Sequence, residues 1–239
     1  MTAELVVVSD ARALARRAAE RIVELTRAAV KTRGSCSVAL AGGSTPRATY
    51  EVLATSALAA AMPWGAISWY FGDERAVPPD HAESNYRAAC ETLFAGREAL
   101  LEHVHRMPAD AVDLEAAARA YGAALPDPLD LVLLGIGEDG HTASLFPGLP
   151  ALAERTARVV VVTGPKPPNP RLSITPPVIE QAREVLVLAS GAGKADAVAR
   201  VLEGPMDTRA LPAQLVRARI WIVDRDAARG LQERPDGRA

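Results

Sequence analysis

The stretch Asp130–Gly148, DLVLLGIGEDGHTASLFPG, joins an apolar run to a turn that carries three glycines, two acids and a histidine. The apolar run Leu131–Ile136 has the length of a strand and leads into a glycine-rich turn, which indicates a buried β-strand. Glycine lets the backbone turn sharply, so the turn should direct Asp139 and His141 into the space beyond the strand. Ligands of open α/β sheets lie at the carboxyl ends of the strands. We therefore interpret this stretch as an active-site turn.

Short apolar runs of the same kind recur along the chain and alternate with helical patterns. The other candidate strands are Leu5–Val8, Ser37–Ala41, Ile67–Phe71, Val159–Val162, Val185–Ala189 and Ile220–Val223. Between the first two, apolar residues fall three to four positions apart, with Asp10 as N-cap and Gly34 as the stop, which predicts a helix packed on the core. The alternation predicts an α/β fold of three αβα layers, with helices on both faces of a mostly parallel sheet.

The composition is that of an ordinary globular protein. Hydrophobic residues make up 49% of the 239 positions, which is enough for a sizeable core. The 27 basic residues against 29 acidic ones leave a formal charge of −2. This balance provides no basic field for nucleic acid or for an anionic membrane, so we expect neither as a partner. No feature of the sequence indicates an obligate protein partner.

The sequence shows no sign of export. The first residues, MTAELVVVSD, lack the charged and apolar regions of a signal peptide, and no apolar run reaches membrane-spanning length. Cys36 and Cys90 indicate neither a disulfide framework nor a thiolate zinc site. We expect a cytoplasmic protein with a single domain over residues 1–230 and a disordered C-terminal tail over residues 231–239.

A glycine turn follows the second candidate strand. The residues Gly42-Gly43-Ser44-Thr45-Pro46 precede a helical pattern, and proline suits the first helical position. Such a turn presents backbone N–H groups, two hydroxyls and the positive end of a helix dipole to an anion, most often a phosphate. An ordinary capped turn is the alternative. The spacing of a Walker loop is absent, and Pro46 stands where a nucleophile elbow requires its last glycine.

Charged side chains follow two further strands. Asp73-Glu74-Arg75 comes after Ile67–Phe71, where these residues could bind substrate or form a salt bridge at the surface. Their place at the carboxyl end of a strand favours substrate binding. Lys194 follows a glycine turn and begins a helix, which suits a point charge that meets a phosphate. A solvated lysine is the alternative there.

Residues 135–140, GIGEDG, match the G-x-G-x-x-G fingerprint of dinucleotide sites. That fingerprint needs a long helix from its third glycine, whereas Pro147 and Gly148 end any helix after about two turns. The motif also lies in mid-chain rather than in a first βαβ unit, so we expect no nucleotide cofactor. His141 could cap the turn, but an imidazole can also take a proton from water near neutral pH, with a nearby acid to orient it.

Two remaining features need an interpretation. The loop Thr163–Arg171, TGPKPPNPR, holds four prolines and is long enough to be a lid. His103 and His105 alternate along a short polar run, but no third metal ligand is evident near them. We interpret these two histidines as surface residues and expect no metal site.

Five motifs, in this order and spacing, resemble those of the bacterial-type 6-phosphogluconolactonases. They are LAGGSTP, GDERAVPPDHAESNY, GIGEDGHTASLFPG, RLSIT and GAGK. The resemblance runs over nearly the whole chain and implies a Rossmann-like fold that is shared with glucosamine-6-phosphate deaminases. It implies hydrolysis of 6-phospho-D-glucono-1,5-lactone to 6-phosphogluconate in the oxidative pentose phosphate pathway, without a cofactor.

The resemblance also implies roles for single residues. His141 would be the general base that activates water. The phosphate contacts would be Gly42, Gly43, Ser44, Thr45 and Lys194. Arg75 and Arg171 would contact the phosphate or the developing oxyanion. Asp73 and Asp139 match acidic positions of the wider superfamily, and either could orient His141 while the other contacts sugar hydroxyls.

Two other functions stay open at this point. In the deaminase relatives the turn looks like GHxAFNEP and supplies a glutamate that assists ring opening, whereas the same position here is Phe146. Isomerisation and deamination need that proton carrier and lactone hydrolysis does not. Related folds also serve as sugar-phosphate sensors in transcription regulators, but such a protein would need a DNA-binding module, and the first strand begins by Leu5. Asp139 and His141 would also be unnecessary in a sensor.

Overall fold

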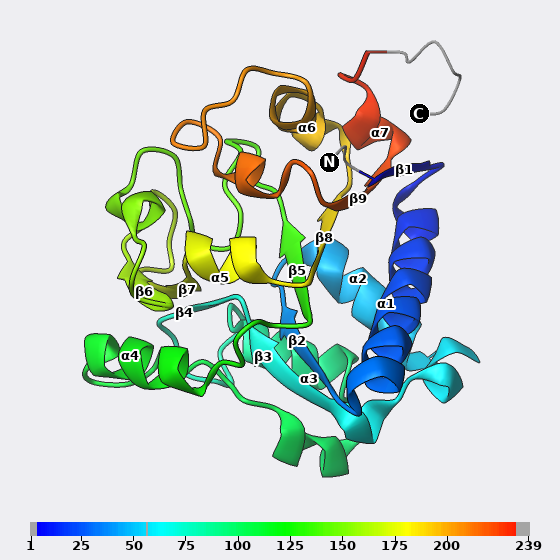
Figure 1. Ribbon diagram of the computed structural model, residues 1–239, viewed down its shortest axis with the longest axis vertical. Coiled ribbons are helices and arrows are strands. Elements are labelled where there is room, and N and C mark those ends of the chain that lie inside the picture. Colours follow the sequence, from blue (N-terminus) through cyan, green and yellow to red (C-terminus); the bar gives the residue numbers. More distant parts are fainter. Residues whose placement is uncertain (1–3, 56, 233–239) are drawn as a thin grey trace.

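The main sheet of the protein consists of six parallel strands. The computed structural model describes residues 4–55 and 57–232, and the sheet has the strand order β1-β9-β8-β5-β2-β3 (Figure 1). The strand bounds are Glu4–Val8 (β1), Cys36–Leu40 (β2), Ile67–Phe71 (β3), Leu131–Gly135 (β5), Glu184–Ala189 (β8) and Ile220–Asp224 (β9). The mostly parallel sheet that the alternating sequence pattern predicts is therefore confirmed.

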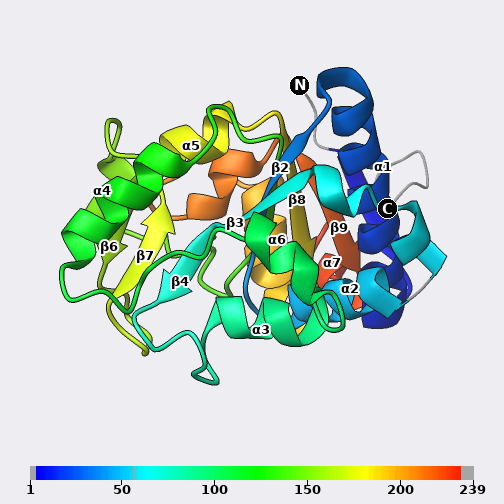
Figure 2. The same ribbon diagram turned by 90° about the horizontal axis from the view of Figure 1, so that it is seen from below.

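Helices cover both faces of this sheet. Helices α1 (Ala11–Arg33) and α2 (Ser44–Thr55) pack against each other on one face, and α5 (Pro176–Gln181) and α6 (Ala195–Leu202) lie on the other (Figures 1 and 2). Right-handed crossovers produce this division, because the chain advances toward β3 through α1 and α2 and returns toward β1 through α5 and α6. Because the six strands are parallel, their carboxyl ends lie along the same edge of the sheet.

Helix α1 has the ends that the sequence predicts. The side chain of Asp10 accepts a hydrogen bond from the backbone N–H of Ala13 at 2.9 Å, and Gly34 ends the helix in the left-handed conformation with a φ of 81°. The helix face that includes Leu14, Ala18 and Ile22 is buried in the hydrophobic core. Local capping and apolar periodicity thus determine this element.

A second, smaller sheet lies beside the main one. It consists of β4 (Asp73–Arg75), β7 (Arg171–Ile174) and β6 (Val159–Val162) in antiparallel pairing, with α4 (Leu114–Ala124) packed on β6 (Figure 1). The predicted strand Val159–Val162 therefore belongs here and not to the parallel sheet. Strands β4 and β7 were not predicted, because β4 consists of three charged residues and β7, although its residues alternate between polar and apolar, is only four residues long and follows a proline loop.

The other elements are short. Helix α3 spans Asn85–Thr92 and α7 spans Arg225–Ala228, and the 3-10 helices are Ala57–Ala61, Trp64–Ala66, Glu98–His103, Pro150–Ala153, Ala192–Lys194 and Pro212–Val216. No helix follows Gly140 within the described stretch 141–149, because Thr142 and Leu145 instead pair in an isolated bridge around a turn. None of the helices among the described residues has the length and apolar character needed to cross a bilayer.

The predicted C-terminal tail is only partly described. Within residues 231–239, Leu231 donates its backbone N–H to the carbonyl oxygen of Ala228 at 2.9 Å, and Gln232 donates to the carboxylate of Glu203. The rest of the predicted tail, residues 233–239, lies outside the described residues.

Candidate active site

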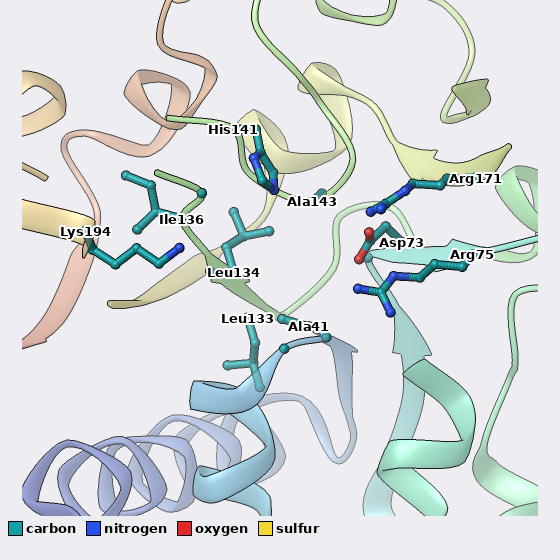
Figure 3. A pocket seen from close by; sticks show the side chains of 15 residues that line it. Ala41, Asp73, Arg75, Leu133, Leu134, Ile136, His141, Ala143, Arg171 and Lys194 are labelled. Carbon is teal, nitrogen blue, oxygen red and sulfur yellow. The ribbon is translucent and has the colours of Figure 1, made fainter. Parts of the chain in front are cut away.

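The turns after β2, β5 and β8 and the start of β4 meet at one cavity of about 180 Å³ (Figure 3). Seven of the predicted site residues line it, namely Gly42, Gly43, Asp73, Arg75, His141, Arg171 and Lys194. Ser44 and Thr45 begin helix α2 directly after this lining and are not part of it. Asp139 reaches the cavity only through His141. The structure thus brings together side chains that come from widely separated parts of the sequence.

Asp139 is the acid that contacts His141. The Nδ1 atom of His141 lies 2.5 Å from Oδ1 of Asp139, which also accepts the backbone N–H of His141 at 3.2 Å. Burial tends to raise the pKa of Asp139, but the hydrogen bonds and the charge of His141 outweigh it and hold that pKa below its ordinary value. A carboxylate acceptor makes Nδ1 the protonated nitrogen of a neutral imidazole, so Nε2 is left to accept a proton.

Glycine is required at Gly137 for this close approach. A Cβ atom there would lie 2.0 Å from Nδ1 of His141 and 2.4 Å from Oδ1 of Asp139. Gly140 meets a different need, since its φ of 82° lies in the left-handed region. The match to a dinucleotide fingerprint therefore reflects the packing of a turn around its own histidine.

Phe146 lies between His141 and Arg171. Its ring centroid is 4.5 Å from that of His141, and the Cζ atom of Arg171 lies 5.5 Å from the ring. Phe146 is 1% exposed, and a Cβ atom on Gly164 would come within 2.4 Å of it. The position where the deaminase-like turn carries a glutamate is thus a buried aromatic wall behind the imidazole.

Asp73 is held by two residues, Ser144 and Asn85, that carry no signal of a catalytic role in the sequence. One carboxylate oxygen accepts the hydroxyl of Ser144 at 2.6 Å, and the other accepts the side-chain amide of Asn85 at 3.3 Å. Gly42 makes room for that amide, because a Cβ atom there would lie 2.0 Å from Oδ1 of Asn85. Asp73 is only 7% exposed. The hydrogen bonds from Ser144 and Asn85 therefore orient the Asp73 carboxylate, whereas the carboxylate that contacts His141 is that of Asp139.

Glu74 attaches helix α3 to strand β4. Its carboxylate accepts the backbone N–H groups of Arg75, Asn85 and Tyr86 at 2.8–2.9 Å and the hydroxyl of Ser84 at 3.1 Å. Burial raises the pKa of Glu74 above its ordinary value in spite of these hydrogen bonds. Of the two acids in this motif, Glu74 holds the structure together and Asp73 lines the cavity.

The loop 163–170 holds the guanidinium of Arg171. The Nε and Nη2 atoms donate to the backbone carbonyl oxygens of residues 166–168 at 3.1–3.4 Å, and Nη1 donates to the hydroxyl oxygen of Ser144 at 3.5 Å. Asn169 closes the loop on itself through two hydrogen bonds with the backbone of Gly164, at 2.8 and 2.9 Å. Burial, together with the charge of Arg75, lowers the pKa of Arg171 below its ordinary value. In this structure the proline loop acts as a clamp on Arg171.

Arg75 stands beside Arg171 because the two residues pair across β4 and β7. The Nη1 atom of Arg75 donates to the carbonyl oxygen of Glu83 at 2.6 Å and lies 3.6 Å from the Glu83 carboxylate. Its buried Nε atom has no hydrogen-bond partner among the described residues. Arg75 therefore pairs with Glu83 at the surface and also lines the cavity.

Lys194 reaches the cavity from the opposite wall. In Figure 3 its ammonium points inward from the turn after β8, across from Arg75 and Arg171, with His141 above the space between them. Three cations then face one cavity that contains the carboxylate of Asp73. Excess positive charge around a small cavity favours an anionic ligand. The site can hold a small molecule at two ends and present it to an imidazole.

His103 and His105 lie away from the cavity. The exposed ring of His105 stacks on that of Tyr70 with centroids 4.6 Å apart, and His103 lies 3.4 Å from the carboxylate of Glu102. Neither histidine lines the cavity. Their interpretation as surface residues is consistent with these positions.

Comparison with known proteins places the chain in a family of enzymes that act on sugar phosphates. The family of glucosamine-6-phosphate isomerases/6-phosphogluconolactonase matches residues 9–223, and the chain belongs to that family. Within it, the 6-phosphogluconolactonase of Mycobacterium tuberculosis is 39% identical in an alignment that covers 95% of this chain and 98% of the relative.

Solved structures lead to the same family. The 6-phosphogluconolactonase of Trypanosoma brucei superposes with a TM-score of 0.83 at 32% identity and covers 97% of this chain and 99% of its own. A monomeric glucosamine-6-phosphate deaminase superposes almost as well, with a TM-score of 0.82 at 25% identity over 96% of this chain and 100% of its own. The fold alone therefore does not separate the two activities, and the residues of the site must do so.

Proposed function

We propose that this protein is a 6-phosphogluconolactonase that hydrolyses 6-phospho-D-glucono-1,5-lactone to 6-phosphogluconate in the cytoplasm. The observation that carries the proposal is the pair His141–Asp139, joined at 2.5 Å, at a cavity with cations on opposite walls. Similarity to the lactonase of Mycobacterium tuberculosis over 95% of the chain supports the same substrate.

Substrate positioning begins with the phosphate. Lys194, Gly42 and Gly43 line the cavity and helix α2 begins directly after the two glycines, so the ammonium, the backbone N–H groups and the start of α2 suit a phosphate. Anchoring this remote group would hold the lactone carbonyl near His141, because binding energy far from the reacting atoms is used for orientation. Ser44 and Thr45 would contribute hydroxyls at the same end.

His141 then acts as the general base. Its Nε2 takes a proton from water as the water oxygen attacks C1 of the lactone, while Asp139 holds Nδ1–H and stabilises the imidazolium that forms. The C1–O5 bond breaks in the next step, and the imidazolium returns the proton to the ring oxygen, which becomes the C5 hydroxyl. The second proton of the water remains on the new carboxylic acid, which ionises and releases that proton to solvent. The proton transfers at the water and at the ring oxygen are carried by His141, so the proposed step uses no metal ion.

The negative charge on the carbonyl oxygen grows near the two arginines. Arg171, held by the backbone of residues 166–168, lines the cavity and Arg75 stands beside it. A donor that is already fixed where charge develops stabilises the transition state without reorganisation. Either arginine fits this role, and the other would contact the phosphate or a sugar hydroxyl.

The deaminase reaction is a weaker candidate for this site. Aldose–ketose isomerisation needs a second proton carrier near the histidine, and Phe146 occupies the corresponding position, 1% exposed and packed against His141. A sugar-phosphate sensor would bind the same anion but would have no need for the His141–Asp139 pair. Lactone hydrolysis uses all of these features.

A direct assay separates these activities. Proton release is followed on freshly prepared 6-phosphogluconolactone and corrected for spontaneous hydrolysis, with ammonia release from glucosamine 6-phosphate as the parallel measurement. We expect activity in the first assay alone. Activity in the second and not in the first would replace the proposed function by deamination, and activity in neither would favour a sensor.

A further inference from the structure

The turn that carries Lys194 is tied to the neighbouring strand by one carboxylate. This turn, residues 190–194, follows β8, and Asp224 ends the adjacent parallel strand β9. One oxygen of Asp224 accepts the hydroxyl of Ser190 at 2.5 Å, and both oxygens lie 3.0–3.1 Å from the backbone nitrogen of Gly191. Asp224 is 3% exposed, so these hydrogen bonds are largely shielded from water.

Capping of helix α7 does not account for this arrangement. Asp224 is the N-cap of α7 and accepts the backbone N–H of Ala227 at 2.8 Å. A capping side chain needs only that bond, as Asp113 shows at the start of α4, where it accepts the N–H of Ala116. The remaining bonds of Asp224 reach across to the turn after β8, and the charge of the carboxylate makes them strong.

Lys194 depends on its turn for its place in the cavity. Gly191 has a φ of 91°, and the backbone N–H of Lys194 donates within the turn to the carbonyl oxygen of Gly191 at 3.0 Å. Within the part of the chain that the structure describes, no carboxylate lies within salt-bridge distance of the Lys194 ammonium. A lysine side chain is long and flexible, so an anchored backbone is what limits the volume that its ammonium can reach.

We infer that Asp224 is a positioning residue for substrate binding, because it fixes the turn 190–194 from which Lys194 enters the cavity. The inference rests on the proposed function, in which Lys194 binds the phosphate of the lactone. Asp224 touches neither the cavity nor the substrate. Its effect should therefore appear in the affinity for the phosphate and not in the chemistry at His141.

The test compares three variants with wild type on two substrates, 6-phosphogluconolactone and unphosphorylated gluconolactone. Asp224→Ser keeps a side-chain oxygen that can cap α7 but removes the carboxylate, and Ser190→Ala removes one donor from the turn side. Asp113→Ser makes the same exchange at an N-cap that does not line the cavity. All variants are first checked for cooperative thermal unfolding.

We expect Asp224→Ser to raise KM for the phosphorylated lactone about tenfold with kcat within about twofold, since loss of uniform binding raises KM alone. Ser190→Ala should change KM in the same direction by a smaller factor, and Asp113→Ser should leave it unchanged. KM for unphosphorylated gluconolactone should not respond to any of the three. An equal rise for both substrates, or a fall in kcat without a rise in KM, would overturn the inference.

A double-mutant cycle separates this inference from the proposed function. If Asp224 acts through Lys194, Asp224→Ser should add nothing to the KM of Lys194→Ala, because the group that it positions is absent. Fully additive effects, with a normal effect of Lys194→Ala, would overturn the role of Asp224 alone. Failure of Lys194→Ala to raise KM for the phosphorylated substrate would overturn the phosphate role of Lys194 and this inference with it.

Discussion

Replacement of Gly137 by alanine should disable the site without unfolding the protein. The new Cβ atom would lie 2.0 Å from Nδ1 of His141, 2.2 Å from Cε1 and 2.4 Å from Oδ1 of Asp139. Ordinary contact begins near 3.4 Å, so the imidazole must move by about 1.4 Å. The backbone can accept alanine, because Gly137 is not among the glycines with positive φ.

The displacement allows an estimate of the loss of activity. The movement separates His141 from Asp139, which now lie 2.5 Å apart, and turns the ring away from its proton-accepting position. A misplacement of about 1 Å can cost about 100-fold in rate, which corresponds to about 2.7 kcal/mol of transition-state stabilisation. We therefore expect kcat for the phosphorylated lactone to fall about 100-fold, while KM changes little because the phosphate contacts are untouched.

Proton release at saturating substrate measures this loss, with circular dichroism and thermal unfolding as the test of the fold. Gly65→Ala is the matched control, since a Cβ atom at Gly65 would meet nothing within 4 Å and the residue does not line the cavity. A folded Gly137→Ala variant that turns over at the wild-type rate would refute the requirement for the observed His141–Asp139 geometry.

Other expected outcomes concern the base, the phosphate contact, the loop clamp and pH. His141→Ala should keep its fold and lose at least about 100-fold in kcat, the usual contribution of a general base; turnover near wild type after correction for spontaneous hydrolysis would contradict its role. Lys194→Ala should raise KM for 6-phosphogluconolactone and leave that for gluconolactone unchanged, which steady-state kinetics on both substrates would reveal. Asn169→Ala should loosen the loop that holds Arg171 and lower kcat/KM about tenfold, less than Arg171→Ala does, and equal activity in the variant and wild type would argue against the clamp. Burial and the charge of Asp10 tend to raise the pKa of Asp224, but hydrogen bonds from Ser190, Ala227 and Gly191 outweigh them and lower this pKa below its ordinary value of 3.8. The ionised carboxylate therefore stabilises the fold at pH values above 3.8, and this contribution is lost as the pH falls through the lower pKa of the folded state. The difference in Tm between wild type and Asp224→Ser should therefore shrink as the pH is lowered below about 4, and a difference independent of pH would contradict this.

Much of the fold was predictable because its signals are local. A strand in the parallel sheet is buried on both sides and reads as a short apolar run, as Leu131–Gly135 does. A helix end shows its cap within a few residues, as Asp10 does with Ala13. Strand β4 of the small antiparallel sheet escaped prediction because Asp73–Arg75 has no apolar alternation and pairs with a segment almost 100 residues away.

The sequence predicted which residues belong to the candidate site but not how they are arranged in space. Its turns contain glycines and charged residues at strand ends, and those are visible in the chain. The partners of Asp73 were not visible, because Ser144 is 71 positions away and Asn85 12 positions away, and neither lies in a pattern that points to Asp73. The same is true of Asp224, whose bonds to the Lys194 turn cross from one strand to the next.

The alternation of strands and helices, the glycine turns at the strand ends and the residue types available for chemistry can be predicted from the sequence, because each depends on neighbours within a few positions. The folded structure was needed to establish that Asp139 rather than Asp73 contacts His141, that Phe146 backs the imidazole, and that Lys194 faces the two arginines across the cavity. These relations depend on which strands lie side by side. Long-range pairing of that kind brings distant residues into contact and leaves no periodic signal along the chain.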